Sequence, residues 1–123
     1  MADGGEVILL APHITEIATT HPGLLDIGYH CRDYFLAHWD EVRHHPWGEL
    51  AHATHLYGAG TYDAVVGERA RVRVTLATGI APEVVRRVNL GVADATTLDL
   101  DALRADPDTL VVPDAGEVLY RLR

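Results

Sequence analysis

The sequence contains no lysine, so all ten of its Lys and Arg residues are arginines. Without lysine, the chain cannot form a Schiff base with a carbonyl substrate, hold a phosphate with a lysine ammonium, or tether a cofactor through a lysine amine. Cysteine is almost as scarce, because Cys31 is the single one. One cysteine permits no internal disulfide, which is typical of a protein from the reducing cytoplasm.

Long apolar runs and an excess of basic residues are also missing. No run approaches the roughly 20 apolar residues of a membrane-spanning helix. The opening Met-Ala-Asp-Gly-Gly-Glu lacks the basic and apolar regions of a signal peptide. Asp and Glu outnumber Lys and Arg by 18 to 10, which gives a net charge of −8. This charge argues against nucleic acid or an anionic membrane as a partner.

The remaining composition is that of one globular domain over residues 1–123. Hydrophobic residues make up 48% of the chain and charged residues 23%, the proportions of a protein with an ordinary buried core. All eight histidines fall between His13 and His55. We therefore expect a functional site in this part of the chain.

Strands and helices are expected to alternate along the chain. Apolar runs and alternation predict strands at residues 6–11, 71–77, 89–93 and 109–112. Helical spacing and turn signals predict helices at residues 24–42, 82–88, 97–105 and 115–120. The type of residues 49–57 stays open, and residues 58–63 are expected to form a loop. This order predicts a layered α/β fold with a mostly parallel sheet flanked by helices.

Three of these elements carry a prediction of burial. The strand at residues 6–11 is continuously apolar, which predicts burial on both faces. The strand at residues 71–77 alternates and is expected to be half-buried. Helix 97–105 would bury its leucines, which are Leu98, Leu100 and Leu103. Because a strand with two buried faces opens the chain, we expect a partner domain or a second copy to cover its flank.

The first candidate site follows the first strand. Ligands of open α/β sheets bind beyond the carboxyl ends of the strands, and His13 and Glu16 occupy that place. They could act as an acid/base pair or bind a hydroxy acid. The alternative is that His13 bonds a turn and Glu16 is solvated.

The second candidate site is His52 and His55. If this segment is helical, the two imidazoles share a face and could reach one metal ion. No third ligand with a defined spacing accompanies them, so two polar histidines at an interface are the favoured interpretation. His44 and His45 are expected at an exposed helix end, and His38 is expected to be packed in the core.

Arg32 and Cys31 complete the candidates. Arg32 and Asp33 are expected to pair at the surface, although Arg32 could bind a substrate carboxylate. Cys31 lies on the apolar side of its helix and is interpreted as a small buried hydrophobic residue. The glycine-containing loop at residues 58–61 lacks the lysine of a phosphate-binding loop.

Six segments taken together resemble the C-terminal portion of proteins related to the nickel-dependent lactate racemase. The segments are residues 4–16 (GGEVILLAPHITE), 28–35 (GYHCRDYF), 50–55 (LAHATH), 74–80 (VTLATGI), 88–91 (VNLG) and 111–122 (VVPDAGEVLYRL). The resemblance is to a branch of that family rather than to lactate racemase itself, and it covers nearly the whole chain.

The resemblance implies an isomerase that racemises or epimerises 2-hydroxy acids with a nickel-pincer nucleotide. In that family the tethering lysine and the catalytic histidines lie in the N-terminal domain, and the C-terminal domain supplies a few cofactor and substrate contacts. This chain has no such lysine. The resemblance therefore implies an N-terminal catalytic domain or split partner that holds the cofactor, with no activity from this chain alone. The contact candidates are His13, Glu16, Arg32, His52 and His55, and the catalytic residues stay unassigned.

Two alternatives from other classes remain open. One is a non-catalytic binding or regulatory module that kept the fold without the catalytic half. The other is a small histidine-rich metal-binding protein.

Overall fold

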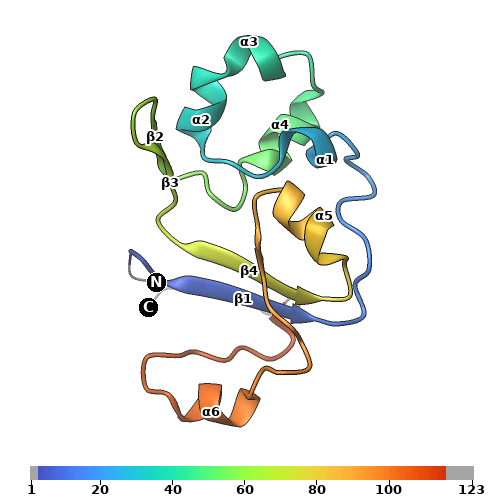
Figure 1. The fold of residues 1–123 in the computed structure, drawn as a ribbon, viewed down its shortest axis with the longest axis vertical. Coiled ribbons are helices and arrows are strands. Elements are labelled where there is room, and N and C mark those ends of the chain that lie inside the picture. Colours follow the sequence, from blue (N-terminus) through green and yellow to red (C-terminus); the bar gives the residue numbers. More distant parts are fainter. Residues whose placement is uncertain (1–2, 116–123) are drawn as a thin grey trace.

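A computed structural model describes residues 3–115 of the chain (Figure 1). Its elements, in order, are β1 (Glu6–Ala11), α1 (Leu24–Ile27), α2 (Arg32–Ala37), α3 (Trp39–Val42), α4 (Trp47–Ala53), β2 (Thr61–Asp63), β3 (Gly67–Arg69), β4 (Arg73–Thr78), α5 (Pro82–Arg87), β5 (Gly91–Val92) and α6 (Leu100–Ala105).

The main sheet is parallel and has the strand order β1-β4-β5. β1 pairs with β4 from Glu6 opposite Arg73 to Ala11 opposite Thr78, and β4 pairs with β5 through Thr75 and Gly91. Each parallel connection needs a crossover, which α1–α4 supply between β1 and β4 and α5 supplies between β4 and β5. The expected α/β class with a parallel sheet is confirmed.

The prediction that β1 is buried on both faces is wrong. Among the strands of residues 3–115, β1 lies at the edge of this sheet, and its Ile8, Leu9 and Leu10 are 38%, 43% and 40% exposed. The strand expected to be half-buried, β4, is instead the central one and buries residues 74–77. A strand's apolar content reports how much surface it could bury, whereas its neighbours in the sheet decide how much it does bury.

A single helix over residues 24–42 was also a wrong prediction, because the segment forms three short helices. α1 ends at Gly28, which adopts a φ of 68° that favours glycine, and its N–H donates to the Leu24 carbonyl oxygen. α2 and α3 meet at His38, whose φ of −107° and ψ of 25° lie outside the helical region. The apolar spacing continues through both breaks, so it could not reveal them.

Helices α1–α4 lie together at one end of the molecule, α5 lies between them and the sheet, and α6 lies beyond the sheet at the other end (Figure 1). Residues 47–53 of the undecided segment are helical. The expected loop at residues 58–63 instead leads into an antiparallel hairpin of β2 and β3. The core joins the sheet to the helices; its fully buried larger side chains are Leu24, Cys31, Val85 and Val88.

The region after β4 agrees with the sequence in part. α5 begins at Pro82, so the proline stands in the first turn of the helix as predicted. β5 lies within the expected strand at residues 89–93. α6 begins at Leu100 rather than at residue 97, because Asp99 caps it, and it contains no buried residue. Its three leucine candidates, Leu98, Leu100 and Leu103, are only half-buried.

The strand expected at residues 109–112 is not formed, and Leu110 is exposed. Thr109–Val112 has the right composition for a strand, but no neighbouring strand pairs with it in the described part of the chain. The helix expected at residues 115–120 falls almost wholly outside the described residues. Within residues 3–115, no helix has the length and apolar character needed to cross a membrane.

Candidate functional site

The loop after β1 and the turn after β4 meet at the carboxyl edge of the sheet. The Gly79 N–H donates to the Ile14 carbonyl oxygen at 2.9 Å, and the Ile14 N–H donates to the Ala11 carbonyl oxygen at 3.0 Å. A Cβ at Gly79 would lie 2.8 Å from the Pro12 carbonyl oxygen. Glycine at this position therefore lets the two loops close on each other where a parallel sheet binds its ligands.

His13 and Glu16 project from this edge. Both are exposed, and neither takes part in a side-chain hydrogen bond or ion pair with another described residue. The two side chains are therefore open to a ligand or a partner surface. This is the position that the sequence predicts for them.

Four rings gather at the junction of α1 and α4. The centroid of His52 lies 5.0 Å from that of His21, 5.9 Å from that of Tyr29 and 6.2 Å from that of His55. α4 ends at Ala53, so His55 lies beyond the helix, yet its ring stays near His52. We call His21, Tyr29, His52 and His55 the ring cluster.

Burial lowers the pKa of His52 below its ordinary value, and the charges of His21 and His55 lower it further. A lowered pKa favours the neutral imidazole at neutral pH. His52 can then accept a hydrogen bond from a hydroxyl group or act as a proton acceptor. Among residues 3–115, no three His, Cys, Asp or Glu side chains are grouped so that they could hold a metal ion.

A buried carboxylate lies beside the ring cluster. Glu49 accepts the Gly23 N–H at 3.0 Å, and its other oxygen lies 3.3 Å from His45 Nδ1. The Gly23 N–H is the main cause that lowers the pKa of Glu49, with His45 and His21 adding to it. The prediction of an exposed helix end therefore holds for His44 and fails for His45, which is half-buried against Glu49.

The sequence did not indicate a second polar junction, because its members are far apart in the chain. His30 Nδ1 lies 2.6 Å from Glu68 Oε2, and Glu68 also accepts the Cys31 N–H. Since a carboxylate only accepts, the ring proton lies on Nδ1. Asn89, with a φ of 62°, donates to the Tyr29 carbonyl oxygen at 2.9 Å. No short motif links His30 to Glu68, so only a contact map could have revealed the pair.

The prediction for Cys31 agrees with the structure, and the prediction that His38 is packed in the core agrees in part. His38 is half-buried; its Nδ1 lies 2.9 Å from the Tyr34 carbonyl oxygen, and its ring stacks on Tyr34 at 4.2 Å. Cys31 is buried, and burial raises the pKa of its thiol, which disfavours the nucleophilic thiolate.

Arg32 lies apart from the ring cluster. Its guanidinium pairs with Asp33 at 3.0 Å on the surface, as expected. Its side chain lines an apolar groove between α2 and α4 together with Trp39 and Trp47. The hydrogen bonds of the Arg32 guanidinium in the described structure go to Asp33 and not to His52 or His55.

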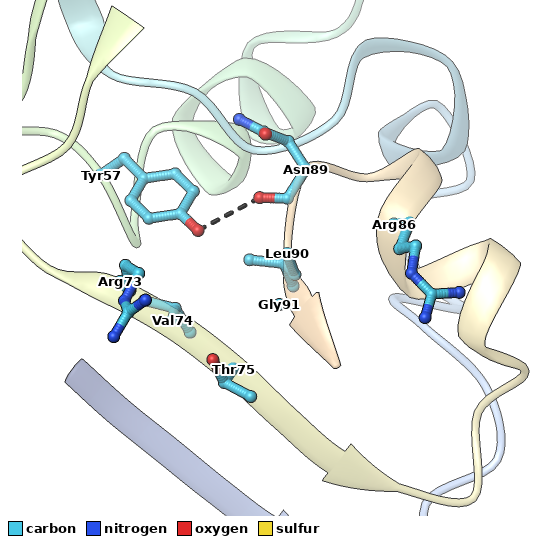
Figure 2. Close-up of a pocket in the computed structure, with 8 residues that line it drawn as sticks. All are labelled: Tyr57, Arg73, Val74, Thr75, Arg86, Asn89, Leu90 and Gly91. Atoms are coloured by element: carbon cyan, nitrogen blue, oxygen red, sulfur yellow. Dashed lines mark hydrogen bonds between the residues drawn. The ribbon is translucent and has the colours of Figure 1, made fainter. Parts of the chain in front are cut away.

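A shallow groove of about 330 Å³ opens beside the first residues of β4 and β5 (Figure 2). Arg73 and Arg86 approach it from opposite sides, and the Tyr57 hydroxyl donates to the Asn89 carbonyl oxygen at 3.1 Å. The Glu6 carboxylate lies 3.2 Å from Arg73 and also accepts the Thr75 hydroxyl. Because Glu6 already neutralises Arg73, this groove is a weaker anion site than its two arginines suggest.

Comparison with known proteins gives one structural relative. No model of a known protein family matches the chain, and no curated protein matches it. A crystal structure of a protein from Thermotoga maritima is similar, with a TM-score of 0.86 and 34% sequence identity. The match covers 100% of this chain and 30% of that one. The same α/β fold thus occurs there within a much longer polypeptide, of which this chain spans less than a third.

Proposed function

We propose that this chain is the C-terminal α/β domain of a lactate racemase-like 2-hydroxy-acid racemase or epimerase and is inactive without its catalytic partner domain. The observation that carries the proposal is the match of the whole chain to 30% of a longer protein at a TM-score of 0.86. It supports a domain that works beside another. The sequence segments quoted above supply the racemase assignment.

In this proposal two surfaces face the partner domain. The first is the carboxyl edge of the sheet, where His13 and Glu16 are free to contact a substrate or the cofactor. The second is the ring cluster, where neutral His52 accepts a hydrogen bond from a hydroxyl group and His55 lies beside it. Arg32 remains a candidate for a substrate carboxylate only if the substrate reaches the groove of α2 and α4.

The residues of this chain do not fit the role of holding the nickel-pincer nucleotide of the family. The sequence has no lysine to carry the pincer, and residues 3–115 group no three metal-ligating side chains. The partner domain would hold the cofactor. The residues named here would position the substrate and exclude water from the closed site.

The test is reconstitution. Interconversion of the enantiomers of lactate, malate and sugar acids is measured for the chain alone and for the chain mixed with a pincer-loaded N-terminal domain of the family. We expect no turnover from the chain alone and turnover from the mixture. His52→Ala and Glu16→Ala should lower the activity of the mixture, with exposed His44→Ala as the matched control. Turnover by the chain alone, or none with any N-terminal domain that binds it, would contradict the proposal.

The metal-binding alternative has its own test. His52 and His55 supply two neighbouring imidazoles, whereas a tight site needs three or four convergent ligands. Calorimetric titration of the chelator-treated chain with nickel or zinc at pH 7 is expected to show only weak binding. One sub-micromolar site that either His52→Ala or His55→Ala abolishes would make metal binding the leading function.

A further inference from the structure

The imidazole of His30, between α1 and α2, is held in one orientation by a carboxylate. Its Nδ1 lies 2.6 Å from Glu68 Oε2, and the other Glu68 oxygen accepts the Cys31 N–H. The His30 and Glu68 side chains are only 17% and 15% exposed. A carboxylate that accepts the Nδ1 proton fixes the tautomer, so the lone pair of the neutral ring lies on Nε2. We call these two side chains the His30–Glu68 pair.

The Nε2 atom of His30 is accessible to a ligand. Within residues 3–115, every buried nitrogen or oxygen of a side chain has a hydrogen-bond partner. Nε2 has no such partner among these residues, so it is not buried. Gly28 leaves room beside it, because a Cβ at this glycine would lie 3.5 Å from Nε2. The His30–Glu68 pair therefore presents an unpaired acceptor to the solvent.

The surroundings of the ring keep it from turning. His30 stacks on Tyr34 with the ring centroids 3.8 Å apart, and the ring of Phe35 lies nearly perpendicular to it at 5.8 Å. The amide nitrogen of Asn89 lies 3.3 Å from Glu68 Oε2 and supports the carboxylate. A polar group that is held in place before its ligand arrives loses little conformational entropy on binding. Nε2 is such a group.

The His30–Glu68 pair favours one class of polar group over another. A neutral imidazole nitrogen accepts a hydrogen bond from a hydroxyl group. The Glu68 carboxylate behind the ring disfavours a second carboxylate at the same place, because like charges repel each other. A hydroxyl group of a ligand is therefore matched to Nε2, and a carboxylate is not.

The His30–Glu68 pair adjoins the ring cluster along the backbone. Tyr29, a member of that cluster, precedes His30 in the chain. The His30 N–H donates to the carbonyl oxygen of Ala53 at 3.1 Å, and Ala53 follows His52. The acceptor nitrogens of His30 and His52 are therefore carried by neighbouring segments of backbone.

We propose that His30 Nε2 accepts a hydrogen bond from a substrate hydroxyl group that lies away from the reacting carbon, and that the substrate is therefore a polyhydroxy acid of the sugar-acid class. This inference rests on the proposed function and names the substrate of the same site. Lactate has one hydroxyl group, and it is on the carbon that reacts. Malate has a second carboxylate in place of a second hydroxyl group. A sugar acid supplies the additional hydroxyl group that Nε2 can accept.

Reconstitution with a pincer-loaded N-terminal domain of the family measures the substrate preference. The ratio kcat/KM is compared for gluconate, lactate and malate at about pH 8, where an imidazole is ordinarily neutral. Gluconate should be the best substrate. His30→Phe, which keeps a ring on Tyr34, should lower kcat/KM for gluconate about tenfold and leave that for lactate unchanged. His38→Phe is the matched control, because the His38 ring also stacks on Tyr34, and it should change neither value.

Glu68→Gln tests the positioning role of the carboxylate. The glutamine amide has one oxygen, which the Cys31 N–H uses, so its NH₂ group faces His30 Nδ1 and moves the ring proton to Nε2. Long-range proton–nitrogen NMR spectra of the full chain should show a proton on Nδ1 in the wild type and on Nε2 in the variant. The kcat/KM for gluconate should fall as it does in His30→Phe. A carboxylate that only supports the fold would change the melting temperature and leave the substrate preference as it was.

Three results would overturn the inference while the proposed function stands. The first is a proton on Nε2 of His30 in the wild-type chain. The second is a kcat/KM for lactate or malate that equals or exceeds that for gluconate, and the third is a His30→Phe variant that turns over gluconate as the wild type does. Absence of turnover with all three acids, in a mixture whose two domains bind each other, contradicts the proposed function itself, and the substrate assignment falls with it.

Discussion

The sheet and the helical end of this molecule are held together in different ways. The sheet rests on a continuous parallel ladder between β1 and β4 and on aliphatic packing that includes Val74, Val85 and Val88. The helical end consists of four helices of seven residues or fewer. Helices of that length are not stable by themselves. They are stabilised by the carboxylates of Glu49 and Glu68, which form hydrogen bonds with residues far away in the sequence.

This difference makes single polar side chains more important at the helical end than in the sheet. A ladder spreads its stabilisation over many similar hydrogen bonds. A bridging carboxylate concentrates it, because its loss leaves several donors without a partner at once. The predictions below test this contrast, beginning with the largest expected effect.

Glu68→Ala should be the most damaging change. It removes the acceptor of the Cys31 N–H and the partner of His30 Nδ1, and the His30 and Glu68 side chains are only 17% and 15% exposed. Leaving such groups unpaired should lower the free energy of unfolding by about 2–4 kcal/mol. Urea unfolding measures it, with exposed Glu83→Ala on α5 as the control. Equal stability of the two variants would remove the contrast between the regions.

Gly23→Ala should come next. The added Cβ would lie 1.9 Å from Glu49 Oε2 and 2.9 Å from His45 Nδ1, so the carboxylate must leave the Gly23 N–H. Overpacking of this kind costs about 1–3 kcal/mol. Gly48→Ala is the matched control, because its nearest neighbour would be the His21 ring at 3.7 Å. It should be neutral or stabilising by about 0.5–1 kcal/mol, since alanine favours a helix. Thermal unfolding of the two variants compares them directly.

The same contrast explains what could be predicted from the sequence. The bounds of β1, the first turn of α5 and the position of β5 depend on local signals, namely an apolar run, a proline and a short apolar segment. The breaks at Gly28 and His38 did not disturb the apolar spacing, so three helices were mistaken for one. The edge position of β1 depends on which strands pair, and this is a property of the whole chain.

The candidate site divides in the same way. The placing of His13 and Glu16 at the carboxyl edge follows from a general property of parallel sheets. The nearness of His52 to His55 follows from their spacing, although α4 ends between them. The addition of His21 and Tyr29 to that cluster, and the pairing of His30 with Glu68, bring together residues far apart in the chain. No local pattern encodes such contacts.

The pH dependence of stability should separate His52 from Glu49. Burial lowers the pKa of folded His52 below the ordinary histidine value of 6.5. As the pH falls through about 6.5, the unfolded chain takes up the proton first, so folding stability is lost until the pH passes the folded pKa. The pKa of Glu49 is lowered from 4.5, so its contribution is lost only on further acidification, below that value.

Urea unfolding of the wild type and of His52→Gln is measured from pH 8 to pH 4. This interval covers the reference pKa values of both His52 and Glu49. The variant should lose less stability than the wild type as the pH falls through about 6.5, and the two profiles should run parallel on further acidification. His13→Gln, an exposed histidine at the sheet edge, is the control. A stability profile of His52→Gln that matches the wild type throughout would show that the ring cluster does not disfavour the protonated form of His52.

Asp99→Ala should have the smallest effect, because α6 belongs to neither region. The Asp99 carboxylate accepts the N–H groups of Asp101 and Ala102 at 3.1 and 2.9 Å and so caps the helix. Losing such a cap costs about 1 kcal/mol. α6 contains no buried residue, so we expect the helix to open locally while the sheet and α1–α4 stay folded. Hydrogen exchange should therefore speed up at residues 101–105 and stay unchanged in β4. Asp99→Asn, which keeps an accepting oxygen, should restore most of the protection. Faster exchange in β4 as well would mean that α6 is coupled to the sheet, and the molecule would then have to be described as one cooperative unit rather than as regions held by different contacts.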